Sequence, residues 1–399
     1  MNSASVTDPR PASAAASPPG RLHLAHVEGL RAVAALTVFV NHAYAQTWAE
    51  WRNENATGAL SVFKYSMIAG HLAVAVFIVI SGFCLTLPVV DGGEKLRGGV
   101  VKFFERRARR ILPPYYGALL LSLALIATVI GKPTGTLWDE PIQADWRAVV
   151  CHFVLVQDFF RTGLINYVFW SIAVEWHLYF VFPLLVWAAR RFGIVRVAGA
   201  ALVVGYAIRF AGDGTRVVRA NPHFIGLFAL GMLAAYVVRS PRSGFTKVKD
   251  LTVWAWVGGA ALAVVATLCV VWDVPGSEPR FHYLDFPVGV LAACVLVHTS
   301  GTRERLLTRF LRVRPLAFVG TFSYSVYLIH APLLQIIWQY ALHPLGVSPD
   351  SMFVLLMTLG LACVLTVSYA FFRVCEEPFM GSSARDEARR QSARIASAA

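Results

Sequence analysis

The sequence has little charge for its length. Of its 399 residues, 15% are Asp, Glu, Lys or Arg, whereas about a quarter are charged in ordinary soluble chains. Hydrophobic residues make up 57%, and the mean hydropathy is +0.58. These values exclude a water-soluble globule and predict long stretches that lie in lipid.

Several motifs of soluble enzymes are also missing. The chain has no Walker-type glycine loop, no dinucleotide-binding fingerprint and no metal-ligand motif, so we expect no metal site and no tightly bound cofactor. Its six cysteines are scattered, without metal-ligand spacing, and we expect small core residues rather than a disulfide framework. Residues 1–21 are rich in Ala, Ser and Pro and have no apolar run, which predicts a disordered tail and no cleavable signal peptide.

Apolar stretches long enough to cross about 30 Å of hydrocarbon recur along the chain. They predict an all-α polytopic membrane protein in which one transmembrane domain, residues 22–378, is followed by a basic cytoplasmic tail, residues 379–399. An eleventh apolar piece, residues 149–160, is too short to cross, and we expect it to be re-entrant or interfacial. The ten predicted spans are at 24–45, 66–90, 111–131, 168–189, 194–211, 222–238, 251–272, 283–299, 316–341 and 351–374.

Positive charge is in excess, and it is distributed unevenly. The chain has 36 Lys and Arg against 23 Asp and Glu, a net charge of +13. If the N-terminus is inside, the inner loops hold 19 Lys and Arg and the outer loops hold 8. The positive-inside rule then places both termini in the cytoplasm and accounts for the charge without a nucleic-acid partner. We expect a multi-pass protein of the cell membrane, the cytoplasmic membrane of a bacterium.

The first predicted span carries two ionisable residues, Arg31 and His42. They are eleven positions apart, so they share one face of a helix and lie about 16 Å apart along its axis. Such groups are costly in lipid and often mark function. They are candidates for lining a polar cavity, although a snorkelling arginine and a histidine bonded to a carbonyl would explain them equally.

Later spans add further buried polar groups. Glu175 lies several residues inside the fourth span, at a depth similar to His42, and needs a partner there; we expect that the two can meet. His177 is on a different face and is a weaker candidate. The ninth span contributes Tyr324 and His330, whose neighbouring hydroxyls also serve as packing contacts in membrane helices.

The first inner loop contains a dense cationic cluster, Arg106, Arg107, Arg109 and Arg110. Such a cluster is most often a topology anchor or a contact with anionic membrane lipids. Guanidinium groups also grip phosphates, which suits a donor such as a nucleotide or coenzyme A. The cluster alone does not decide between these roles.

Six motifs follow one another along the chain. They are Glu28-Gly29-Leu30-Arg31 with His42; Phe77-Ile78-Val79-Ile80-Ser81-Gly82-Phe83; Arg106-Arg107 with Arg110-Ile111 and Pro113; Trp170-Ser171 with Val174-Glu175 and Tyr179; Ser323-Tyr324-Ser325 with Tyr327 and His330-Ala331-Pro332; and Glu376 with Pro378. In this order they resemble the integral-membrane acyltransferase-3 family, which moves acyl groups, usually acetyl, onto carbohydrate hydroxyls. The resemblance covers almost the whole chain. Two departures are Glu28, where the family more often has Asp, and Trp176-His177 after Glu175, where the family more often has an acidic or Gln-containing pair.

The resemblance implies a ten-span domain that takes an acyl-CoA, most often acetyl-CoA, from the cytoplasmic side. It implies that Arg31 and His42 are essential and that Arg106, Arg107 and Arg110 bind the donor. Since only about 25 residues follow the last span, we expect the stand-alone form of the family, without an extracytoplasmic hydrolase-like domain.

Acyl transfer to a hydroxyl needs a base, and an imidazole suits neutral pH. We therefore expect His42 to be the general base, with Glu175 orienting it and Arg31 holding a donor phosphate or the carboxylate. His42 as a covalent acyl carrier is an open alternative. Further candidates for lining the pocket are Ser81, Trp170, Tyr324 and His330.

Two other function classes stay open at this stage. A membrane transporter of an acyl group or small solute also needs buried ionisable residues, but the chain has no strong internal repeat. A non-catalytic partner in glycan assembly is the second. For the enzyme, the expected acceptor is a carbohydrate or a glycosylated compound.

Overall fold

The computed structural model describes residues 24–48, 56, 58–160, 162–272, 280–301, 304–381, 385–386 and 388–389. Over these residues the chain is helical and has no β-strand. The predicted disordered tail at 1–21, and the basic tail from residue 390 on, lie outside the described residues. The described part is thus all-α, as the apolar runs predict.

Each of the ten expected apolar segments folds as helix. Short helices connect several of them: α4 (Trp146–Phe153), α7 (Arg216–Arg219), α9 (Ser243–Val248) and α12 (Leu306–Leu311). The long elements are α1 (Ala25–Thr47), α2 (Ser66–Asp91), α3 (Gly99–Thr128), α5 (Phe169–Phe192), α6 (Ile194–Ala211), α8 (Phe224–Arg239), α10 (Val253–Val271), α11 (Phe281–Ser300), the pair α13 (Arg314–Thr321) and α14 (Ser323–Ile337), and the pair α15 (Pro349–Leu355) and α16 (Leu361–Phe371).

Fewer than ten of these helices qualify as membrane spans by length and composition. Among the described residues seven are long and apolar enough, or eight if the bent pair α13–α14 counts as one span. Helix α8 is apolar but has only 16 residues, and α1 has 23 residues but carries Glu28, Arg31, Asn41 and His42. The chain is a polytopic membrane protein, and the expected number of ten spans and their orientation stay predictions.

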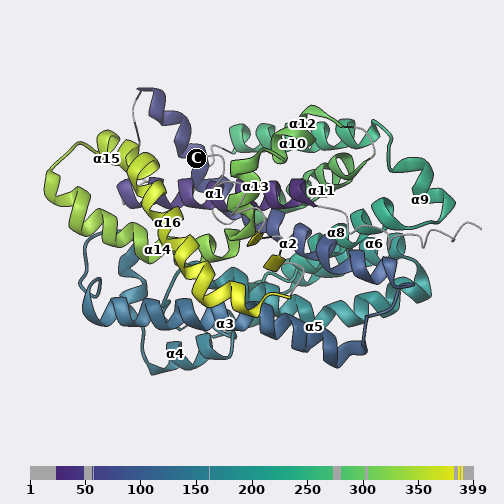
Figure 1. The fold of residues 1–399 in the computed structure, drawn as a ribbon, viewed down its shortest axis with the longest axis horizontal. Coiled ribbons are helices and arrows are strands. Elements are labelled where there is room, and N and C mark those ends of the chain that lie inside the picture. The colour runs from purple at the N-terminus through teal and green to yellow at the C-terminus, as the bar shows by residue number, and fades with distance from the viewer. Residues whose placement is uncertain are drawn as a thin grey trace, which may run out of the picture.

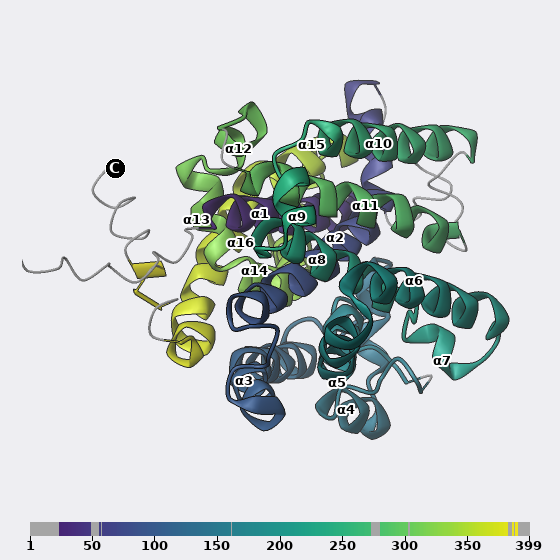
Figure 2. The same cartoon turned by 90° about the vertical axis from the view of Figure 1, so that its right-hand side faces the viewer.

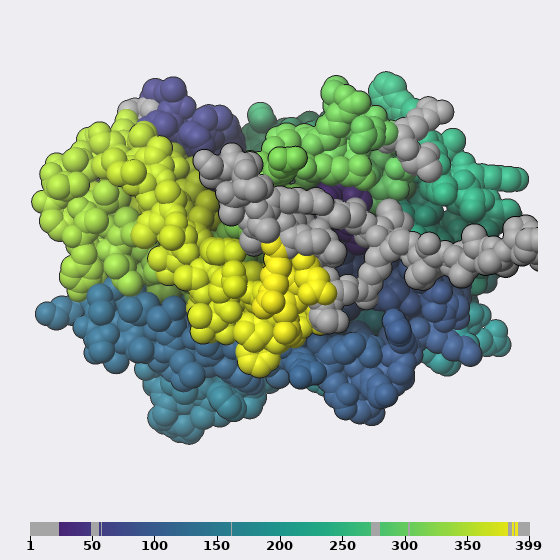
Figure 3. Space-filling model, in the orientation of Figure 1, coloured from purple at the N-terminus to yellow at the C-terminus, as the bar shows by residue number. Residues whose placement is uncertain are grey.

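Helices α1 and α2 lie side by side in the middle of the molecule (Figure 1). Helix α2 also packs against α8 and α11. Viewed at right angles, α10 and α11 lie on one side of this centre and α3, α4 and α5 on the other (Figure 2). The C-terminal helices cover the face beside α3 (Figure 3). Later helices therefore surround the two N-terminal helices.

The central helices approach closely because small residues stand at their contacts. Gly82 of α2 packs against the backbone carbonyl of Phe228 in α8, and Gly231 of α8 packs against the carbonyl of Val79. A Cβ atom at either glycine would overlap with that carbonyl. In membrane proteins, where water does not drive helices together, such close backbone packing stabilises the helix pair. Gly82 is thus explained by packing.

The ninth expected span is not a continuous helix. Helices α13 and α14 meet at an angle of 77°, with the break at Phe322. Non-helical backbone at membrane depth is tolerated where it lines a cavity or is buried in protein. Residues on both sides of this break line a cavity, described next.

The short piece expected at 149–160 begins as α4, which has 8 residues. It is anchored to α3, because the hydroxyl groups of Tyr115 and Tyr116 donate to the carbonyls of His152 (2.8 Å) and Phe153 (2.9 Å). Helix α4 ends at Phe153 and turns follow it, so the helical part is too short to cross a membrane.

Candidate active site

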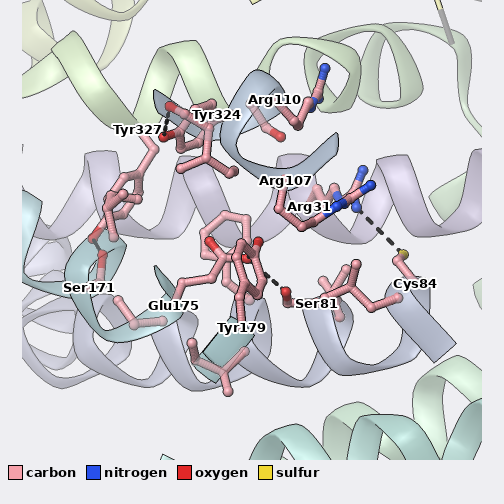
Figure 4. Close-up of a pocket in the computed structure, with 18 of the residues that line it drawn as sticks. Arg31, Ser81, Cys84, Arg107, Arg110, Ser171, Glu175, Tyr179, Tyr324 and Tyr327 are labelled. Atoms are coloured by element: carbon pink, nitrogen blue, oxygen red, sulfur yellow. Dashed lines mark hydrogen bonds between the residues drawn. The ribbon is translucent and has the colours of Figure 1, made fainter. Parts of the chain in front are cut away.

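A cavity of about 140 Å³ lies among α1, α2, α3, α5 and the bend between α13 and α14. We call it the arginine cavity, because Arg31, Arg107 and Arg110 line it (Figure 4). Helix α2 faces it with one stripe, from Val74 to Leu85, at helical spacing. Residues from five of the six sequence motifs thus meet in one place.

The three arginines differ in how their charge is balanced. Arg31 pairs with Glu28 (3.0 Å) and also donates to Sγ of Cys84 (3.5 Å). Arg110 pairs with the buried Glu376 (2.9 Å). Arg107 forms no ion pair with any described residue, and its Nε is buried without a hydrogen-bond partner. An anion entering this cavity would find one guanidinium without a direct ion pair, although the carboxylate of Glu175 lines the same cavity and attracts Arg107 through space.

Glu175 lies in the arginine cavity and not against His42. Its Oε1 accepts hydrogen bonds from Ser81 and from Tyr179, both at 2.7 Å. The packing of α5 against α2 decides this, since a match in depth along two helices does not say which faces meet. The contact expected between Glu175 and His42 is thus absent from the described structure.

A second cavity, of about 290 Å³, is lined by α1, α2, α11, α14 and the segment before α5. His42 opens into it. Nδ1 of His42 is 2.7 Å from Nε2 of His330, and the edge of the imidazole packs on Tyr167, with ring centroids 4.7 Å apart. We call this the imidazole cavity. The sequence identifies both histidines as candidate site residues but does not predict that they pair.

The hydrogen bonds of His330 fix where the protons are. Its Nδ1 lies 3.0 and 2.8 Å from the carbonyls of Val326 and Tyr327. Carbonyls only accept, so Nδ1 of His330 carries the proton, and in the neutral ring Nε2 is the acceptor. His42 must then donate from Nδ1, which leaves the lone pair on its Nε2. That nitrogen has no hydrogen-bond partner among the described residues, so His42 is arranged as a base.

The two cavities adjoin. Val74 and Tyr327 line both of them, and the hydroxyl of Tyr327 is held 2.6 Å from Oγ of Ser171. Arg31 and His42, on one face of α1, therefore open into neighbouring cavities separated by these side chains. Their spacing of eleven positions puts them on the same face of α1 but about three turns apart, so each lines a different cavity.

The other predicted residues are placed as follows. Tyr324 lines the arginine cavity and donates to the carbonyl of Ile111 (3.2 Å), and Trp170 lines the imidazole cavity. Arg106 is exposed, donates to the carbonyl of Arg97 (2.8 Å) and lines neither cavity. His177 bonds to the carbonyl of Leu155 (2.8 Å), away from both.

Sequence reasoning missed one group of residues beside the imidazole cavity. Asp285 is fully buried and lies within hydrogen-bond distance of His71 and His223. The available signal was the position of Asp285 and His71 inside predicted spans, where ionisable residues are rare. Within the described ranges, no group of three or more His, Cys, Asp or Glu side chains is placed to hold a metal ion.

Comparisons with known proteins agree on one kind of domain. A family model described as an acyltransferase domain matches residues 24–373. The chain is 25% identical over 382 residues to the O-acetyltransferase OatA of Staphylococcus aureus, covering 88% of this chain and 56% of that protein. It is 26% identical over 345 residues to the acyltransferase MdmB of Streptomyces mycarofaciens, covering 80% and 81%.

A third relative is the putative peptidoglycan O-acetyltransferase YrhL of Bacillus subtilis, which is 24% identical over 332 residues, with 77% of this chain and 48% of that protein covered. The chain thus spans about half the length of OatA and YrhL. No solved structure matches it.

Proposed function

The chain belongs to the acyltransferase-3 family, and from that premise we propose that it is a membrane O-acyltransferase. Its reaction moves an acyl group, in the simplest case acetyl, from acyl-CoA to a hydroxyl of a carbohydrate or glycosylated acceptor. The relatives named as O-acetyltransferases support acetyl as the group and oxygen as its destination.

One observation carries this proposal: Arg31 and His42, on the same helix, open into two adjoining cavities of different chemistry. The arginine cavity suits the phosphate groups of a coenzyme A donor, because guanidinium groups bind phosphate through paired, charge-assisted hydrogen bonds. The imidazole cavity offers a base with a free lone pair. A donor held in the first, with its thioester extended past Tyr327, would present the carbonyl to His42.

The proposed transfer is a direct one. Nε2 of His42 takes the proton of the acceptor hydroxyl as the oxygen attacks the thioester carbonyl. The C–O bond forms, the C–S bond breaks, and the thiolate leaves with the proton returned from His42. His330 keeps the lone pair of His42 on Nε2 and so acts as a positioning residue. Glu175 does not contact His42, so we assign it instead to ordering the arginine cavity through Ser81 and Tyr179.

Arg107 is the residue we assign most directly to the donor. It lines the cavity, it makes no direct ion pair with a described residue, and its Nε lacks a hydrogen-bond partner among the described residues. Arg110 and Arg31 are already neutralised by Glu376 and Glu28, so they contribute shape and hydrogen bonds more than net charge. Arg106 points elsewhere, and we assign it to the surface.

The test is release of free thiol from acyl-CoA by the purified protein in lipid nanodiscs, with and without carbohydrate acceptors. We expect acceptor-dependent release by the wild type and none by His42→Ala. His343→Ala is the matched control, because His343 is an exposed imidazole that lines neither cavity. Equal release by His42→Ala and the wild type would refute the assigned base. A wild type that binds the donor and releases no thiol with any acceptor would refute the activity.

A further inference from the structure

The buried carboxylate of Asp285 is shared by two imidazoles. Nε2 of His223, at the start of α8, lies 2.8 Å from Oδ2. Nε2 of His71, on α2, lies 3.2 Å from Oδ1 and 3.3 Å from Oδ2. Burying a carboxylate is costly unless it is paired and hydrogen-bonded, so the two rings explain how Asp285 is tolerated in α11.

The two imidazoles are not equivalent. The side chain of His223 is 1% exposed and contributes to neither cavity. The side chain of His71 is 19% exposed and lines the imidazole cavity together with His42. Two aromatic rings clamp it, Phe281 with centroids 4.6 Å apart and Trp170 with centroids 5.8 Å apart. His223 thus has only the packing role, whereas His71 reaches the cavity surface.

The proton positions on His71 follow from its partner. A carboxylate only accepts, so Nε2 of His71 donates to Asp285, and in the neutral ring the lone pair is on Nδ1. Nδ1 has no hydrogen-bond partner among the described residues, and it is not one of the buried unpartnered atoms. It therefore stays accessible, as a fixed acceptor held in a clamped ring.

The close contact of α1 and α2 brings this acceptor beside the proposed base. The side chain of Asn41 lies where a Cβ atom at Gly70 would be, so the two helices touch at these positions. His42 and His71 are the next residues on each helix, and all four line the imidazole cavity. Two imidazoles with free lone pairs thus line the same cavity.

The lining of the cavity indicates the class of its ligand. Polar groups enter it from different elements, among them Asn41, His42, His71, Tyr167 and Tyr327, and its walls are partly aromatic and partly aliphatic. A cavity that holds only an acyl chain would not need this set of polar groups. A ring bearing several hydroxyls, with apolar faces and polar edges, fits both features.

We propose that the imidazole cavity is the carbohydrate-binding site and that His71, oriented by Asp285, hydrogen-bonds a hydroxyl of the acceptor. This inference rests on the proposed function and adds to it the place where the acceptor is held. His71 holds the sugar so that a second hydroxyl meets His42. The residue selects the acceptor and the hydroxyl that is modified, while His42 takes the proton.

The test compares His71→Gln with His223→Gln. Glutamine keeps a side-chain N–H for Asp285 but removes the cavity-facing Nδ1 of His71. Dissociation constants of methyl β-glucoside and methyl β-N-acetylglucosaminide are measured by ligand-observed NMR on full-length protein in nanodiscs. We expect His71→Gln to weaken binding about tenfold, the loss of one hydrogen bond to a fixed acceptor, and His223→Gln to match the wild type.

Binding by the wild type that His71→Gln leaves unchanged would overturn the proposal, as would failure of both sugars to bind. Equal weakening in both variants would also overturn it, since it would show that His71 acts only through the packing of Asp285. These binding outcomes are separate from thiol release. Sugar binding lost in His71→Gln, in a protein that releases no thiol, would therefore refute the proposed reaction and leave the binding site standing.

Discussion

Replacement of His330 by phenylalanine tests the arrangement of the proposed base. Phenylalanine keeps a ring of similar size in this buried position but lacks the acceptor nitrogen that lies 2.7 Å from Nδ1 of His42. The proton of His42 loses its partner, and the ring is free to place its lone pair on either nitrogen. We expect turnover to fall while the affinity for acyl-CoA stays unchanged.

The size of the effect follows from the hydrogen bond that is lost. Leaving a buried donor without an acceptor costs about 1–3 kcal/mol. At about 1.4 kcal/mol for each tenfold change in rate, this corresponds to a decrease in kcat of about 5- to 150-fold. The carbonyls of Val326 and Tyr327 lose little, because they lie within α14, where helical hydrogen bonds also satisfy them.

The assay is acceptor-dependent thiol release at saturating acyl-CoA, for the wild type, His330→Phe and His330→Gln. Glutamine can present its carbonyl oxygen near the position of Nε2 and should restore most of the rate. Wild-type turnover in His330→Phe would refute the argument from proton positions. Equal loss in the phenylalanine and glutamine variants, both correctly folded, would show that His330 acts in some other way.

Three further predictions concern charge, packing and pH. Arg107→Gln should raise KM for acyl-CoA by more than about tenfold, the loss of a charged hydrogen bond, whereas Arg106→Gln should leave KM unchanged, as measured by initial rates. Gly82→Ala should lower the melting temperature by forcing α2 from α8 at a cost of about 1–3 kcal/mol, and thermal unfolding in nanodiscs checks this. Asp158 lies between α4 and α5, where burial raises its pKa from 3.8 to about 8. An acid whose folded pKa is raised contributes stability that is complete below its unfolded pKa and falls as pH rises toward 8, so Asp158→Asn should gain in melting temperature over the wild type between pH 5 and pH 9. A constant difference between the two proteins over that range would contradict this.

The sequence predicts the helices well because the signal is local. Each of the ten apolar runs folds as helix, since length and hydropathy need no knowledge of neighbours. The break at Phe322 is not predicted. Its cause is tertiary: both arms of the bend line the arginine cavity, and Gly320 packs against the backbone carbonyl of Glu28. Gly320, Thr321 and Ser323 stand beside that position, but small and hydroxyl residues are also common in continuous membrane helices, so they do not by themselves indicate a break.

The sequence predicts which residues belong to the site but not which of them contact one another. Arg31, His42, Ser81, Glu175 and Tyr324 each line one of the two cavities, and His330 lies within hydrogen-bond distance of His42. The sequence identifies them because ionisable and hydroxyl groups in lipid are costly and stand out in an apolar run. Which of them touch is decided by helix packing. Glu175 meets Ser81 and Tyr179, and His42 meets His330. The Asp285 cluster joins three helices that are far apart in sequence, so no spacing reveals it.

The most direct test of the account is transfer of an isotopically labelled acetyl group from acetyl-CoA by the wild-type protein in nanodiscs. The acceptor is a soluble peptidoglycan disaccharide or a methyl hexoside, and both products are analysed by mass spectrometry. We expect label on an acceptor hydroxyl, in an amount equal to the free coenzyme A released, and no labelled acceptor with His42→Ala. Label that stays on coenzyme A, or that appears only as free acetate with every acceptor, would contradict the central claim that this chain is an O-acyltransferase.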